Sequence, residues 1–369
     1  MKGQRIFGAN RLNANLTIRD GAGNFIVCYL LQIILQFLLT LVLMATDVSD
    51  TFQTTVAYTC LLCSINEISI ISAPTLYSKV LGQNYFKGMG FNKKVSVVQV
   101  LLLIVIAILM VCAFAPIANY FVNFIYWTGF DASKISTLTV KTVPELIASI
   151  VFVALVPSVC EEITYRGMIG RSFTSKNMIF AIFMSAFLFA IMHGSPVQLV
   201  YQFALGAIVC LIFFTTHSIY TAMIVHFASN TIALVGGYIS YVNNITAVND
   251  LVYIVMMVFG LITLPIVLYF FIKISNKDKW VDVKNTKSIN EKLKLMFETV
   301  EDKKEREDVE KQVEINLSKL ETQEAKEVYL EHVKTSKMKN TSIDRKALIL
   351  AIAFGMFVWI INTILCYIW

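Results

Sequence analysis

The stretch Cys160-Glu161-Glu162-Ile163-Thr164-Tyr165-Arg166 places two acids and one arginine inside an otherwise apolar part of the chain. Downstream, residues 177–272 contain no Lys or Arg, and Asp250 is their one acid. An ionised side chain near the centre of a bilayer costs roughly 2.5–3.5 kcal/mol on insertion scales. Charges that are kept at this cost indicate a functional site, and the rest of the sequence is interpreted from this stretch outward.

Helical spacing separates the roles of the three charged groups. Glu162 and Arg166 are four residues apart and therefore share one face of a helix, which predicts an ion pair between them. Glu161 points to a neighbouring face and has no basic residue one turn away. It is the spare carboxylate, partly removed from water, and we expect it to serve as a general base.

The composition indicates an all-α, polytopic membrane protein. The chain has 369 residues, of which 57% are hydrophobic, and its apolar runs approach the ~20 residues that a helix needs to cross a ~30 Å hydrocarbon core. We predict a bundle of about nine spans with a cytoplasmic helical insert before the last one. The predicted spans start near residues 25, 54, 95, 142, 177, 197, 217, 251 and 347.

The distribution of positive charge predicts the orientation. Basic residues precede the first span and lie again between spans two and three, whereas the loop between spans one and two has none. Because cytoplasmic loops are rich in Lys and Arg, we expect an integral protein of the cell membrane with a cytoplasmic N-terminus. The formal charge of +6 follows this topology, so we expect no nucleic-acid partner.

Changes in composition divide the chain into four predicted parts. Residues 1–75 hold the N-terminal segment and two spans, 76–272 a protease-like core, 273–346 a charged cytoplasmic insert, and 347–369 the last span. Apolar spacing in the insert predicts amphipathic helices near 289–300 and 309–320. The insert is expected to be solvated and is a candidate contact for a cytoplasmic partner.

Further polar residues occur in the apolar spans. His193 follows Phe189 by one helical turn, and Asn230 follows His226 by one turn. The directions of the predicted spans allow these side chains to converge with Glu161. Glu67, in span two, is instead predicted to be a buried polar contact or a carboxylate that snorkels to the interface.

These motifs, in this order in apolar helices, resemble the CAAX-processing and bacteriocin-processing (CPBP) family of intramembrane proteases. The resemblance extends over about residues 80–235. It implies a glutamic protease that cleaves a membrane-presented peptide or protein tail, with catalytic and supporting residues as follows. Glu161 activates water, helped by His193; His226 and Asn230 stabilise the oxyanion; Glu162 and Arg166 form the supporting pair.

Several alternatives stay open at this level. Glu161, His193 and His226 could hold a zinc ion, but there is no His-Glu-x-x-His motif and Asn is a poor zinc ligand, so we expect chemistry without a cofactor. A non-catalytic membrane binding or bacteriocin self-immunity protein would use the same fold. A small-solute transporter is disfavoured because no repeated pair of interrupted helices is visible. The expected partners are membrane lipid and a peptide substrate.

Overall fold

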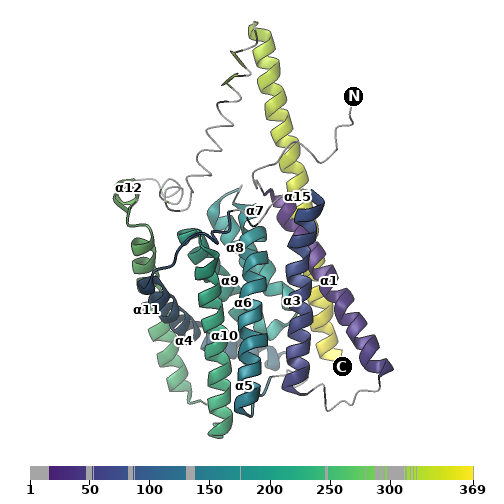
Figure 1. The fold of residues 1–369 in the computed structure, drawn as a ribbon, viewed down its shortest axis with the longest axis vertical. Helices are drawn as coiled ribbons and strands as arrows, with labels where there is room; N and C mark the ends of the chain where they lie inside the picture. The colour runs from purple at the N-terminus through teal and green to yellow at the C-terminus, as the bar shows by residue number, and fades with distance from the viewer. Residues whose placement is uncertain are drawn as a thin grey trace.

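The computed structural model describes residues 16–46, 54–81, 88–129, 138–174, 176–245, 248–278, 280–286 and 322–368, with a few isolated positions between them. Over these residues the protein is helical and contains no strand (Figure 1). The helices lie side by side in one bundle. In chain order they are α1 (Ile18–Ala45), α3 (Val56–Leu81), α4 (Val97–Trp127), α5 (Val143–Ser149), η2 (Ile150–Leu155), α6 (Val156–Glu161), η3 (Glu162–Gly170), α7 (Arg171–Phe173), α8 (Met178–Met192), η4 (Pro196–Gln198), α9 (Leu199–Thr216), α10 (Ile219–Val242), α11 (Asp250–Ser275), α12 (Trp280–Asn285) and α15 (Gln323–Ile368).

The predicted spans coincide with helices, with one correction to their number. Eight helical segments of the described chain are long and apolar enough to cross a membrane. The fifth predicted span, near residue 177, is α8, which has 15 residues and is shorter than a full crossing. It ends early because Gly194 follows with a φ of +62°, a conformation that stops a helix and that glycine adopts without strain.

The helix that carries the acidic pair is continuous but not uniformly α-helical. Residues 143–173 run through α5, η2, α6, η3 and α7, of which η2 and η3 are π-helical. It starts at a capping box, in which Thr142 and Glu145 bond each other's backbone N–H groups. Short π segments in longer α-helices are often found at functional sites. The sequence-based expectation of regular α-helical spacing is therefore only approximate over this helix.

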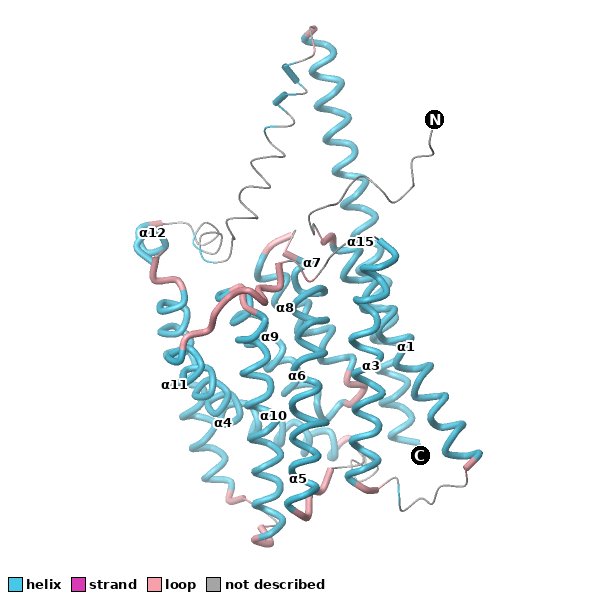
Figure 2. The backbone as a smooth tube through the Cα atoms, in the orientation of Figure 1, coloured by secondary structure: helices cyan, strands magenta, loops and turns pink. Residues whose placement is uncertain are grey.

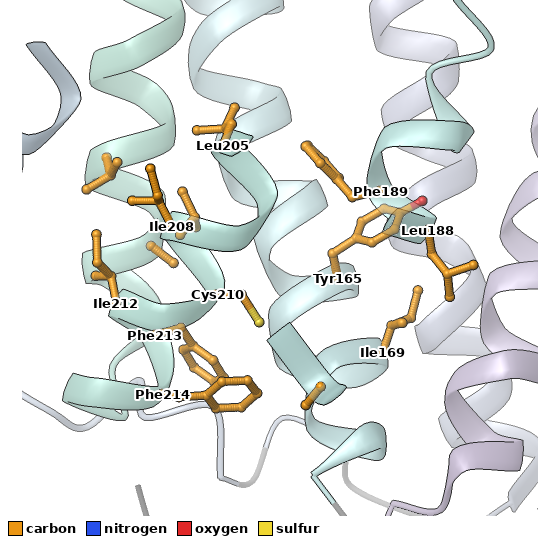
Figure 3. Close-up of a cluster of buried hydrophobic side chains, with 14 of the residues drawn as sticks. Tyr165, Ile169, Leu188, Phe189, Leu205, Ile208, Cys210, Ile212, Phe213 and Phe214 are labelled. Carbon is orange, nitrogen blue, oxygen red and sulfur yellow. The ribbon is translucent and has the colours of Figure 1, made fainter. Parts of the chain in front are cut away.

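The apolar core surrounds η3. Tyr165 and Ile169 of η3 pack beside Leu188 and Phe189 of α8, with α9 residues such as Cys210 nearby (Figure 3). These side chains are all almost completely inaccessible to solvent. The acidic pair therefore lies on the central helix of the bundle.

Helices from the two ends of the chain cover one flank of this centre. α1 packs against α3 and α15, and all three lie on the same side of the bundle in Figure 1. Polar contacts join them: Tyr77 on α3 donates to Asp20 on α1 at 3.1 Å, and Arg19 lies 4.0 Å from Asp344 on α15. The first and last predicted spans are thus parts of one bundle with the core.

The charged region before the last span is described only in part. α15 begins at Gln323, within that region, and continues without interruption into the last span, so that its first half extends beyond the bundle (Figure 2). Most of the amphipathic helix predicted near 289–300, and half of the one near 309–320, fall outside the described residues.

Candidate functional site

The two adjacent acids lie where α6 meets η3. Glu161 is the last residue of α6 and Glu162 the first of η3. Glu161 is 8% exposed and Glu162 is completely buried. Neither side chain reaches bulk solvent, so each needs partners within the protein.

Glu162 forms the predicted ion pair with Arg166. Nη1 of Arg166 is 3.1 Å from Oε1 of Glu162, and both side chains are completely buried. Nη2 of the same arginine donates to the Gly206 carbonyl at 3.3 Å, and the guanidinium lies 4.5 Å from the centre of the Phe189 ring. The arginine therefore joins η3 to α8 and α9.

His226 bridges the two acids, an arrangement that the sequence did not predict. Its Nδ1 is 2.7 Å from Oε1 of Glu162, and its Nε2 is 3.6 Å from Oε2 of Glu161. The first distance is a strong hydrogen bond, whereas the second is too long for one. With Glu162 already compensated by Arg166, Nδ1–H donates to Glu162, and the imidazole presents Nε2 to Glu161. The hydrogen bond at Nδ1 therefore fixes the orientation of the imidazole ring of His226.

His193 approaches the same centre from the end of α8. Its Nδ1 is 2.8 Å from the Phe189 carbonyl, which can only accept, so Nδ1 carries the proton. The ring packs edge-on against Phe189 with 4.8 Å between ring centres, and the ring of His226 packs edge-on against the same phenylalanine at 6.0 Å. Nε2 is thus the nitrogen left available for chemistry. The turn after His193 contacts the last span, where Asn362 lies beside Gly194.

Asn230 is on the same face of α10 as His226 but has a different direct contact. Its Nδ2 donates to the Val153 carbonyl at 3.4 Å. Val153 belongs to η2, close to Pro157 on the acidic helix. This hydrogen bond therefore fixes α10 against the acidic helix. One of its two amide hydrogens is engaged in this way.

Glu67 is a member of the cluster that the sequence-based prediction left out. It is 4% exposed, and its carboxyl group lies within hydrogen-bonding distance of that of Glu161. The possibility that it snorkels to the interface is wrong, whereas the predicted buried polar contact is present. The available signal was an acid in the apolar run of span two, but nothing in the sequence gave its partner.

The described residues contain no cluster of three or more His, Cys, Asp and Glu side chains arranged to hold a metal ion. The zinc set considered above, Glu161, His193 and His226, is thus not assembled as a ligand sphere in this structure. His226 instead contacts both acids, and the rings of His193 and His226 both pack edge-on against Phe189.

Fold and site together define an all-helical integral membrane protein with a buried glutamate–histidine centre. Residues 143–232 match the family described as type II CAAX prenyl endopeptidase Rce1-like, so the chain contains a domain of this family. The match covers the acidic helix, both histidines and Asn230, which confirms the resemblance to CPBP proteins. No curated protein and no solved structure matches the chain. Glu67 and the last span lie outside the matched segment.

Proposed function

We propose that this protein is an intramembrane glutamic endopeptidase that hydrolyses a peptide bond in a membrane-presented peptide or protein tail. The observation that supports this most is the enclosure of Glu161 and Glu162 around His226, within a segment that matches a family of endopeptidases. Structural ion pairs are common, but an acid beside two histidines and away from solvent has the composition of a hydrolytic centre.

In the proposed mechanism Glu161 is the general base. Its Oε2 and the Nε2 of His226 are 3.6 Å apart. This separation is just beyond hydrogen-bonding distance and suits two groups that hydrogen-bond to the same water molecule. As the water oxygen attacks the peptide carbonyl carbon, Glu161 takes one of its protons. It then returns that proton to the departing amine when the C–N bond breaks.

The other residues orient the base and stabilise the developing charge. Glu162 and Arg166 fix the ring of His226, which leaves its Nε2 directed at the reaction centre. His193 can assist proton transfer through Nε2, and the second amide hydrogen of Asn230 can donate to the oxyanion. Donors of this kind are typically worth about 10²–10³ in rate.

The decisive experiment compares Glu161→Gln with wild type in a reconstituted bilayer. The substrates are a panel of membrane-anchored peptides, with and without a prenylated C-terminal cysteine motif. We expect cleavage by the wild type and a loss of about 10²–10⁴-fold in Glu161→Gln, the usual contribution of a general base. Glu145→Gln is the matched control, because glutamine preserves its capping box and the residue starts the same helix.

Cleavage by Glu161→Gln at the wild-type rate would rule out the proposed mechanism. Biological complementation by that variant would favour the non-catalytic alternative, a membrane binding or self-immunity protein, for which the described structure offers no specific support. Faster cleavage of the prenylated peptides would show that this protein recognises the prenyl group named in the family description. Equal cleavage rates would show that it does not.

The proposal includes an orientation. Arg19 at the start of α1, Arg171 beside Gly88, and Asp344 of α15 lie at one end of the bundle. This basic end is the cytoplasmic one by the distribution of positive charge, and the first half of α15 extends from it as a candidate contact for a cytoplasmic partner. Labelling of single cysteines placed at residue 19 and at residue 128, with a reagent that does not cross membranes, tests which end is inside.

A further inference from the structure

The carboxyl group of Glu67 packs against that of Glu161, the proposed general base. Glu67 lies outside the segment that matches the family. Glu67 belongs to α3, whereas the match begins at residue 143. Its side chain is 4% exposed, and its carboxyl reaches that of Glu161 within hydrogen-bonding distance. Two carboxyl groups that close, away from water, cannot both be ionised, so one proton is shared between them.

The surroundings decide which acid keeps the proton. Glu161 faces Nε2 of His226, which can take up a proton and then stabilise a negative charge on Glu161. The titratable groups facing Glu67 are, besides Glu161, the thiols of Cys28 on α1, Cys63 on its own helix and Cys160 on α6. None of these thiols supplies a positive charge, so ionisation is favoured at Glu161.

The hydrogen bonding of Glu67 leads to the same assignment. Its Oε2 is buried and has no hydrogen-bond partner among the described residues. A buried carboxylate with an unsatisfied oxygen would be costly, whereas the carbonyl oxygen of a neutral acid is much less so. A neutral Glu67 also carries the one hydrogen that can be donated to Glu161.

The helix that carries Glu67 is fixed to the acidic helix nearby. The hydroxyl of Thr164, three residues after Glu161, donates to the Ile70 carbonyl, three residues after Glu67, at 2.9 Å. Both groups are buried. This bond holds the two helices in the register that brings the carboxyl groups together.

We infer that Glu67 is a positioning residue, held in its neutral form, that donates a hydrogen bond to the ionised Glu161 and fixes it for attack on water. The inference rests on the proposed function of Glu161. Glu67 keeps its proton throughout the reaction, while Glu161 accepts and returns the proton of water. The proposed role thus needs a neutral donor of the size of glutamate at position 67.

Two substitutions separate this role from packing and from direct catalysis. Glu67→Gln keeps shape and an N–H donor but cannot ionise, whereas Glu67→Met keeps volume and removes the donor. We expect Glu67→Gln to retain kcat within about threefold, and Glu67→Met to lose about 10²-fold in kcat with KM unchanged, the scale of a misplaced catalytic group. Ile68→Met, on the exposed side of the same helix, is the control.

Infrared difference spectra of the purified protein test the proton directly and do not depend on activity. We expect wild type to show a protonated-carboxyl C=O band that disappears in Glu67→Gln and persists in Glu161→Gln. If Glu67→Gln leaves the band in place or abolishes cleavage, or if Glu67→Met cleaves normally, the inference is wrong. Should the wild type cleave nothing, or Glu161→Gln cleave normally, the proposed function fails, and the band still decides whether Glu67 holds the proton.

Discussion

Two helical segments of this chain, η3 and α11, have opposite surroundings. All nine residues of η3 are buried, including the charged Glu162 and Arg166. In α11, which has 26 residues, the buried positions are Gly260, Leu264 and Phe271. α11 lies at the edge of the bundle against α4, whereas η3 lies in its middle (Figure 1).

The difference shows what determines whether a helix of a membrane protein lies inside the bundle or at its lipid-facing edge. Lipid is as apolar as leucine, so hydrophobicity alone gives a helix no preference between the bundle interior and the lipid. The charges of η3 must be enclosed, because they cannot be hydrated in the hydrocarbon layer. α11 has no charge in its central part and needs only one close contact. The following substitutions test this contrast.

The largest expected effect comes from the buried ion pair. Arg166→Met leaves Glu162 without its guanidinium partner, and breaking a buried pair typically costs about 3–5 kcal/mol. Unfolding by SDS in mixed micelles measures this loss of stability. Lys273→Met removes a cation from the exposed end of α11 and should change stability by less than about 0.5 kcal/mol. Equal effects of the two substitutions would contradict the contrast.

A pair of isoleucines tests packing without charge. Ile169 on η3 is completely buried, whereas Ile262 on α11 is 60% exposed. Ile169→Ala should cost about 2–5 kcal/mol because it leaves a cavity among close-packed helices. Ile262→Ala should have little effect, since lipid chains can fill the space. The same SDS titration gives both values, and a large loss for Ile262→Ala would show that α11 has an unrecognised partner.

The smallest expected effect concerns the contact of α11 with α4. A Cβ atom added at Gly260 would lie 2.5 Å from the backbone nitrogen of Ala113, which a side-chain adjustment cannot relieve. Gly260→Ala should therefore destabilise the protein by about 1–3 kcal/mol, the usual cost of overpacking. At Gly236, on α10, such a Cβ would have no atom of the described residues within 4 Å apart from its own stretch of helix. Gly236→Ala is the matched control and should be neutral or slightly stabilising in thermal unfolding.

Most of the helical architecture could be predicted from local pattern. The lengths of the apolar runs placed the helices close to their observed positions, since this signal depends on neighbours in sequence. The prediction failed where the signal was not periodic. The length of α8 was overestimated, and the π-helical turns of η2 and η3 left no recognisable mark in the sequence.

The site was predictable to the extent that its contacts are local. The Glu162–Arg166 pair follows from four-residue spacing, and it is present. The bridge from His226 to both acids joins residues 64 positions apart, and spacing carries no information about such a contact. The bond of Asn230 to Val153 depends in the same way on how α10 lies against a proline-containing helix.

By itself, the sequence determined that this chain forms membrane helices and that Glu161, Glu162 and Arg166 are enclosed, because the cost of charge in hydrocarbon applies whatever the fold. Only the tertiary structure decided which groups meet them. It brought His226 between the two acids and placed Glu67 against Glu161, since helix packing sets those distances and no local rule does.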